Sequence, residues 1–169
     1  MRTRRFALAT ATAILFFSAY TFAQQTKPTG VVASVELKAI VPTGYFYRGK
    51  SATVQARNSA AIRTKDQKYV IAALVDTAGY ATDIAEKYQG LLITEVKLKI
   101  EGSDLAPGQY GLGFVDDKFV VTDVGANDVL SVSSKLDGDL KRPVPLKIVG
   151  EGGTYRLYHG KKYVTVQVE

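Results

Sequence analysis

The sequence of 169 residues has no cysteine, no tryptophan and a single histidine. The absence of cysteine excludes disulfides, thiolate zinc sites, a cysteine nucleophile and an acylated lipoprotein anchor. His159 lies in an expected turn beside Gly160 and two lysines, with no nucleophile motif nearby, so a catalytic triad is not indicated. The acids at Asp116-Asp117 and Asp137-Gly138-Asp139 lack a calcium-loop pattern. We therefore expect no metal, no cofactor and no catalytic residue, and interpret the chain as a non-enzymatic protein.

Residues 1–23 have the pattern of a secretory signal peptide. Three arginines lie within the first five residues, and an uncharged, mostly apolar run follows from Phe6 to Phe22. Thr21-Phe22-Ala23 then places small residues three before and one before an expected cut ahead of Gln24. A membrane-spanning helix usually needs ~20 predominantly apolar residues, whereas several residues of this run are alanine, threonine or serine. We expect cleavage, export to the periplasm or the cell exterior, and a mature chain that does not span a membrane.

The charge of the mature chain is modest. The whole chain has a net charge of +6, but the expected cleavage removes three arginines and no acid. The remaining 146 residues carry 19 basic and 16 acidic side chains, a net charge of +3. This charge is ordinary for a soluble domain and does not indicate nucleic-acid binding. The length suits one domain. We expect a flexible lead-in over residues 24–30 and a single β-domain over residues 31–169.

Hydrophobic residues in the mature chain recur mainly with a period of two, which is typical of strands. Tyr69–Val75 is apolar on both faces, which predicts a central strand covered on both sides. Leu91–Glu101 alternates apolar and charged residues, which predicts one strand with a buried and a wet face. Further strand candidates are 31–41, 45–48, 51–57, 60–64, 109–115, 118–124, 144–149, 154–158 and 163–168, while 128–140 is ambiguous. From these candidates we expect around nine or ten strands.

One short helix is expected after residue 82. Asp83 and Glu86 have capping-box spacing, and Gly90 follows where a helix would stop, so Asp83 is expected to cap a helix over residues 84–89. Many short strands with few helices indicate an all-β, mainly antiparallel fold. The sequential hairpins favour a small β-barrel with one short helix, and a two-sheet β-sandwich is the alternative.

Tyrosines and two strand glycines are the candidate recognition features. Nine tyrosines remain after cleavage, against three phenylalanines, and tyrosine has an apolar body and a polar tip. Tyr45 and Tyr47 point the same way on one expected strand, and three more tyrosines cluster around the last hairpin. Gly111 and Gly113 bare one face of their strand, so a large side chain, another strand or a ligand can approach it closely. We predict that Tyr45, Tyr47, Gly111 and Gly113 line or adjoin a ligand or partner site. The competing interpretation is that a neighbouring aromatic fills this space.

Three stretches, residues 45–59, 74–80 and 105–115, resemble secreted bacterial β-domain proteins of unknown function. The overall character is also similar to small lipocalin-like barrels, although the Gly-x-Trp signature of that family is missing because the chain has no tryptophan. The resemblance implies an exported β-domain and attaches no activity to it.

Three functions remain open. The favoured interpretation is an exported, non-enzymatic binding or interaction module of a bacterial envelope that holds a small apolar or aromatic ligand, as a small barrel can. The first alternative is a surface-interaction protein that binds an envelope partner or an anionic polymer through tyrosine, lysine and arginine. The less favoured alternative is a carboxylate-dependent hydrolase, since the sequence does not show which acids meet in space. A cavity above ~300 Å³ would favour ligand binding, and a filled interior would favour surface interaction.

Overall fold

The computed structural model describes residues 27–169, so the predicted signal peptide lies outside the described residues. The described chain is almost entirely β-structure with two short helices. Its elements in order are β1 (Gly30–Val31), α1 (Ser34–Ile40), β2 (Gly44–Tyr47), β3 (Lys50–Arg63), β4 (Tyr69–Val75), α2 (Thr82–Lys87), β5 (Gly90–Thr94), β6 (Leu98–Ile100), β7 (Ser103–Leu105), β8 (Gly108–Val115), β9 (Lys118–Thr122), β10 (Asp128–Ser133), β11 (Lys135–Leu136), β12 (Val144–Glu151), β13 (Thr154–Gly160) and β14 (Lys162–Val168).

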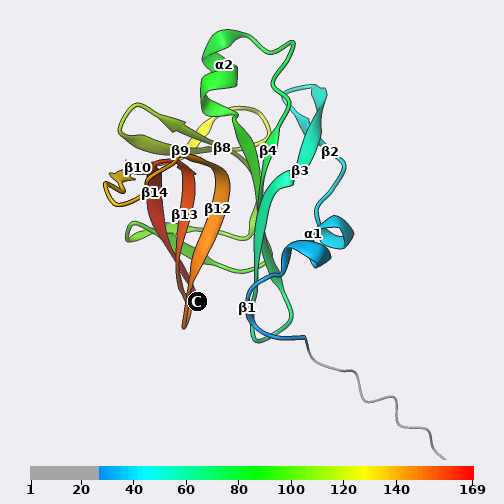
Figure 1. Ribbon diagram of the computed structural model, residues 1–169. Helices are drawn as coiled ribbons and strands as arrows, with labels where there is room; N and C mark the ends of the chain where they lie inside the picture. Colours follow the sequence, from blue (N-terminus) through cyan, green and yellow to red (C-terminus); the bar gives the residue numbers. More distant parts are fainter. Residues whose placement is uncertain (1–26) are drawn as a thin grey trace, which may run out of the picture.

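The strands form two antiparallel sheets (Figure 1). The eight-stranded sheet has the order β1-β3-β4-β5-β8-β9-β10, with β2 paired to β3. The six-stranded sheet has the order β12-β13-β14-β6-β7, with β11 paired to β14. The mainly antiparallel β-class is confirmed. The barrel is not, because the two sheets remain separate across residues 27–169, an arrangement that fits the sandwich alternative.

The prediction of one strand over Leu91–Glu101 is wrong. The chain ends β5 at Thr94 and crosses to the other sheet before β6 begins at Leu98. The crossing is held locally, because the Glu95 carboxylate accepts the backbone N–H of Tyr69 at 2.7 Å. The alternation nevertheless predicted the buried face correctly, since residues on both sides of the crossing face the same core. The alternation of apolar and charged residues continues through the change of sheet. This alternation alone therefore does not distinguish two strands in different sheets from one continuous strand.

Both faces of the eight-stranded sheet are covered. One face packs against the six-stranded sheet, and aliphatic and aromatic side chains from both sheets form the main core. The other face packs against α1, α2 and the β2–β3 hairpin through a second cluster rich in tyrosine. The central strand β4 contributes Val70 and Ala72 to the first cluster and Ile71 and Ala73 to the second. The predicted strand over Tyr69–Val75, covered on both sides, is therefore confirmed.

The helices differ from the prediction. The strand candidate over residues 31–41 contains α1, whose Leu37 is buried in the second cluster. Helix α2 begins at Thr82, so Asp83 lies inside its first turn. Its N-cap is Ala81, and no side chain caps it. The predicted Asp83 cap is wrong because the helix begins earlier than the capping-box spacing requires. The ambiguous stretch over residues 128–140 forms β10 and β11.

Candidate functional site

The predicted pair Tyr45 and Tyr47 lies in the interior of the molecule. Their side chains are buried in the second cluster, between the β2–β3 hairpin and the eight-stranded sheet. The Tyr47 ring stacks on Tyr88, with 3.8 Å between ring centroids, and its hydroxyl lies 2.6 Å from the Thr122 hydroxyl. Tyr80 meets the same cluster edge-on and donates a hydrogen bond to the Tyr47 carbonyl. Tyr45 and Tyr47 therefore lie on one face of β2, as predicted, and that face packs against other residues of the protein's interior.

The bare face at the two glycines is filled by the protein's own atoms. A Cβ at Gly111 would lie 2.7 Å from the Thr122 hydroxyl oxygen and 2.8 Å from the Tyr47 ring. A Cβ at Gly113 would lie 2.7 Å from the carbonyl oxygens of Glu86 and Lys87 in α2. The glycines thus allow an aromatic ring and a helix to approach the strand, as the competing interpretation expected. A ligand site at Tyr45, Tyr47, Gly111 and Gly113 stays a prediction.

Two hydroxyls of the tyrosine cluster are unpartnered. Tyr45 and Tyr88 are buried, and neither hydroxyl has a hydrogen-bond partner in the described part of the chain. Burial raises the pKa of both phenols, so both remain neutral at ordinary pH. The Tyr45 and Tyr88 rings are therefore held in the cluster by packing, without a hydrogen bond from their hydroxyls.

The space between the two sheets is filled. The crevice that remains there has a volume of about 10 Å³ and is lined by aliphatic side chains and Tyr155. Ligand pockets usually have volumes of about 300–1,000 Å³. The sandwich interior is therefore closed to the small ligand that the barrel hypothesis placed inside.

A groove of about 620 Å³ lies at the end of the sandwich where the β3–β4 and β12–β13 turns face each other. The start of β1 and the end of β14 complete its rim. Its volume falls within the usual range of ligand pockets. The lining residues are Thr29, Gly30, Ile62, Arg63, Thr64, Lys65, Asp66, Glu151, Gly152, Gly153, Tyr155, Val168 and Glu169.

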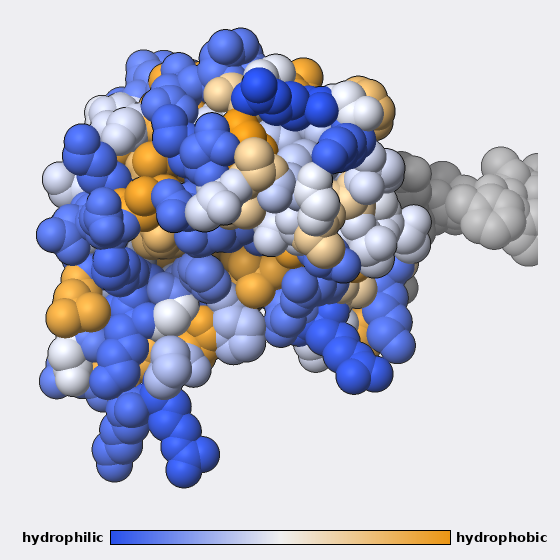
Figure 2. Space-filling view, turned by 90° about the horizontal axis from the view of Figure 1, so that it is seen from above, coloured by the Kyte–Doolittle hydropathy of each residue, from blue (hydrophilic) through white to orange (hydrophobic). Residues whose placement is uncertain are grey.

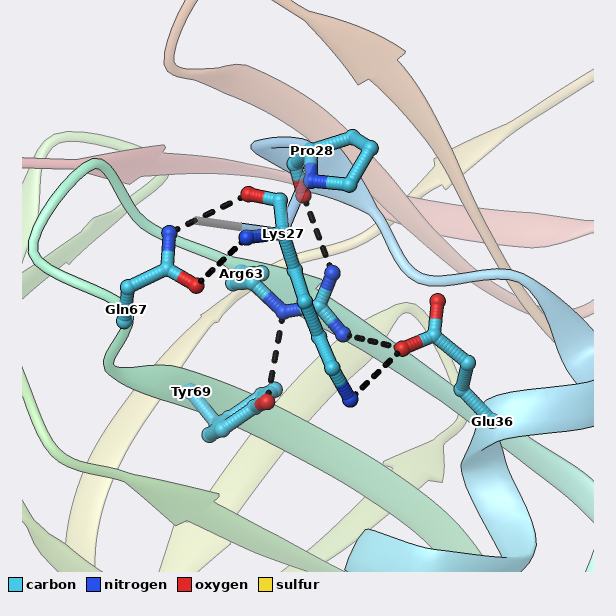
Figure 3. A network of polar contacts seen from close by, with 6 residues as sticks. All are labelled: Lys27, Pro28, Glu36, Arg63, Gln67 and Tyr69. Atoms are coloured by element: carbon cyan, nitrogen blue, oxygen red, sulfur yellow. Dashed lines mark hydrogen bonds and ion pairs between the residues drawn. The ribbon is translucent and has the colours of Figure 1, made fainter. Parts of the chain in front are cut away.

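One wall of the groove is fixed by Arg63, at the end of β3 (Figure 3). Its side chain is 2% exposed, and its guanidinium donates to the Glu36 carboxylate at 2.7 Å, the Pro28 carbonyl at 3.0 Å and the Tyr69 hydroxyl at 3.2 Å. The hydrogen bond from Arg63 lowers the pKa of Glu36. All three guanidinium nitrogens are engaged, so Arg63 acts as a structural tie rather than as a free cation.

The same network holds the first described residues against the rim. Lys27 and Gln67 exchange two hydrogen bonds, and the Lys27 ammonium lies 3.2 Å from the Glu36 carboxylate (Figure 3). The predicted lead-in over residues 24–30 is described from Lys27 onward, and there it contacts the β3–β4 turn and pairs with β3 through Gly30.

The opposite wall carries few side chains. The turn between β12 and β13 contains Gly152 and Gly153, with φ values of 63° and 87°. Both glycines adopt the left-handed backbone conformation that a tight turn between twisted strands requires. The wall is therefore mostly backbone, which lets a ligand approach closely.

The floor of the groove combines apolar surface with one polar atom. Ile62 and Val168 line it, together with Tyr155, whose side chain is 5% exposed. Tyr155 also borders the interior crevice, so its ring separates the groove from the main core. Among the described residues its hydroxyl makes no side-chain hydrogen bond and is not among the fully enclosed unpaired atoms.

The sequence reasoning missed this groove. In the sequence Tyr155 is only one of three tyrosines around the last hairpin, and the structure separates them. Tyr155 faces inward, whereas the Tyr158 and Tyr163 rings pair on the opposite face of the sheet, 5.1 Å apart. The alternation along β13 could have separated Tyr155 from Tyr158, but no local signal places Tyr155 beside Ile62.

The remaining surface offers two negative findings. Within residues 27–169, no group of three histidine, cysteine or acidic side chains is arranged to hold a metal ion. No helix in this part of the chain has the length and hydrophobicity needed to cross a membrane. Seen from the α2 side, the surface is mostly hydrophilic, with smaller hydrophobic areas between the polar side chains (Figure 2).

Comparison with known proteins found no matching family model, no similar curated protein and no similar solved structure.

Proposed function

We propose that the protein is an exported, non-catalytic binding module that holds a small apolar or aromatic ligand in the groove at the end of the sandwich. The observation that carries the proposal is the groove itself, whose volume of about 620 Å³ falls within the usual range of ligand pockets and whose lining includes Ile62, Tyr155 and Val168. Pockets of this kind orient a ligand with few polar groups while apolar contacts provide most of the affinity. An aromatic body of such a ligand would contact Ile62, Tyr155 and Val168, and its polar group would face the charged side chains of the lining: Lys65, Asp66, Glu151 and Glu169.

The rigidity of the groove supports binding rather than simple surface roughness. The Arg63 network fixes one wall, and the paired strands β12 and β13 hold the turn that forms the other. A preformed groove spares the ligand the ordering cost that a mobile site imposes. The hydrogen bonds and the ion pair of Arg63 are therefore expected to contribute to ligand affinity as well as to stability.

The proposal is tested with 1-naphthol, which has one hydroxyl, and naphthalene, which has none, by NMR titration of the purified mature protein. We expect both probes to shift resonances of Ile62, Tyr155 and Val168. Tyr155→Phe removes only the hydroxyl and should weaken 1-naphthol binding about fivefold, the effect of a hydrogen bond of ~1 kcal/mol, while leaving naphthalene unchanged. Tyr110→Phe is the matched control, because its hydroxyl bonds the Ala106 carbonyl away from the groove.

A second variant tests the groove independently of the small change in affinity that is expected for Tyr155→Phe. Glu151 is exposed at the rim, so Glu151→Trp should fill the groove without disturbing the core and should weaken both probes. Resonance shifts confined to another part of the surface, or equal effects of Tyr155→Phe and Tyr110→Phe, would show that the groove is not the binding site.

Export is a separate part of the proposal and rests on the sequence pattern of residues 1–23. Mass spectrometry of protein produced with its natural N-terminus should find a mature chain that begins near Gln24. Soluble cytoplasmic protein that retains Met1 would contradict export.

A further inference from the structure

The segment that forms β11–β14 differs in charge from the rest of the described chain. Residues 27–133 carry 12 basic and 12 acidic side chains, whereas residues 134–169 carry seven basic and four acidic ones. The whole excess positive charge of the described chain therefore lies in β11–β14 and their connections. Of those seven basic side chains, Lys135 and Lys162 have a carboxylate within 4.0 Å. The other five have none among the described residues: Lys141, Arg142, Lys147, Arg156 and Lys161.

Within residues 27–169, no helix covers the outer face of the six-stranded sheet. Both helices pack against the eight-stranded sheet, so the outer side of β12, β13 and β14 faces outward (Figure 1). Exposed Lys147 and Arg156 project from neighbouring strands of this face. An uncovered sheet face with unpaired cations attracts anions.

The cations lie in a regular array with tyrosines between them. The strand registers place Lys135 opposite Tyr163, Tyr163 opposite Tyr158, and Tyr158 opposite Lys147. This row crosses four strands, a length of about 14 Å at the usual spacing of neighbouring strands. Arg156 lies over the Tyr163 ring, 4.8 Å from its centroid, and so is held flat against the face. Tyr158 is buried within this row, and the Lys135 ammonium is bound to the Glu101 carboxylate at 2.7 Å. A linear polymer that crosses the row would therefore contact Tyr163, Lys147 and Arg156.

A shallow hollow adjoins the row. It has a volume of about 80 Å³ and is lined by Leu140, Val144, Lys147, Val149 and Tyr158. The Tyr158 hydroxyl donates to the Asp137 carboxylate at 2.8 Å, which fixes the ring and occupies that acid. The volume of the hollow is below the usual ~300 Å³ of a ligand pocket, so it can hold only part of a bound polymer unit.

We infer that this face binds a carboxylate-bearing polysaccharide. Uncharged hydrogen-bonding side chains flank the cations, with Thr165 opposite Arg156 and Gln167 opposite Thr154, and such groups suit sugar hydroxyls. A protein partner would need a fully buried apolar centre with anchoring side chains. Of the large hydrophobic side chains that are well exposed in the described residues, only Leu136 lies on β11–β14. This composition favours an acidic glycan over an acidic protein.

The test uses an oligogalacturonate of defined length, with its methyl ester as a neutral match and polyglutamate as a protein-like polyanion. Isothermal titration at two salt concentrations should show that the oligogalacturonate binds and that the ester binds at least tenfold more weakly. The double variant Lys147→Gln with Arg156→Gln should weaken binding about tenfold or more. The control is Lys38→Gln with Lys68→Gln, which removes the same charge from exposed positions outside this face.

Each outcome of these titrations either supports or overturns the inference. The inference is supported if oligogalacturonate binding is lost only in the double variant of Lys147 and Arg156, while circular dichroism shows that both double variants are folded. Equal losses in the two double variants would show attraction by net charge only and would overturn it. Equal binding of the ester, or no binding of the oligogalacturonate, would also overturn it. Tighter binding of polyglutamate than of oligogalacturonate would replace the glycan with an acidic polypeptide. Tyr155→Phe should leave this binding unchanged, so failure here is distinct from failure of the groove.

Discussion

The rings of Tyr47 and Tyr88 stack with 3.8 Å between centroids and 13° between planes, directly over the bare backbone of Gly111. Strand β2 and the end of α2 thereby lie together on the outer face of the eight-stranded sheet. The stack explains why two tyrosines and a glycine that looked like recognition residues in the sequence lie in the interior of the fold.

The stack leaves no room for a methyl group at position 111. Gly111→Ala would place a Cβ within 2.8 Å of both Thr122 and Tyr47, and we expect a loss of about 1–3 kcal/mol of unfolding free energy from overpacking. Urea denaturation measures this loss. Gly138→Ala is the control, because a Cβ there would meet no atom within 4 Å. Equal stability of the two variants would mean that the stack is looser than described.

The predicted site at Tyr45 and Gly113 can be tested against simple packing. Tyr45 is 4% exposed, so we expect Tyr45→Ala to cost about 3–5 kcal/mol, as for other large core truncations. Gly113→Val should also destabilise, since its side chain would collide with backbone carbonyls of α2. Binding of 1-naphthol should then fall only as far as the folded fraction falls. A larger loss of affinity than of folded protein would restore these residues to the ligand site.

The start of α2 offers a stabilising substitution. Ala81 has the extended backbone of an N-cap, with φ −63° and ψ 152°, but no side chain to accept an amide hydrogen bond. Ala81→Ser should raise the unfolding free energy by about 1 kcal/mol. Asp83→Ala should change it by less than about 0.5 kcal/mol, because Asp83 caps nothing. A larger cost for Asp83→Ala than gain for Ala81→Ser would indicate that the helix begins later.

His159 should give the protein a pH dependence near neutrality. Burial lowers the pKa of the imidazole, whose ring lies 5.9 Å from Phe114. The unfolded chain therefore takes up the proton first as the pH falls. The contribution to stability is complete above the unfolded pKa of about 6.5 and is lost as the pH falls from there toward the folded pKa.

The measurement is the urea midpoint between pH 5 and pH 7.5. The chain has only one histidine, so His159→Gln should remove most of the slope in this range. A slope that persists in the variant would assign it to another group.

The sequence predicts correctly those parts of the fold whose burial can be read from the residues of a single strand. Strand β4 was predicted with the bounds it has, because both its faces are apolar. Helix α1 was missed because its β-branched residues resemble a strand, although Leu37 and Val41 are spaced four apart and both enter the tyrosine cluster. Two apolar residues spaced four apart are only weak evidence for a helix when several nearby valines favour a strand.

The candidate groove could not have been predicted because it depends on residues brought together by pairing over long distances. Ile62 and Tyr155 lie on different sheets, and each belongs to a strand whose local pattern predicts only a buried position. The opening between them lies where the β3–β4 and β12–β13 turns face each other at one end of the sandwich. The charge of the outer face, in contrast, is visible in the sequence once the strands of one sheet are known.

Residues 29–30 and residues 168–169 border the same groove. A purification tag or fusion partner joined near either end would stand at the mouth of the groove and compete with whatever enters it. Attachment for experiments on the groove should therefore use an internal position, such as the exposed turn at Gly138, which adjoins the opposite end of β14 through the bond from Asp137 to the Lys161 carbonyl. The same proximity makes a circular permutant of residues 27–169 practical, in which a short linker joins Glu169 to Lys27 and the chain is reopened at Gly138.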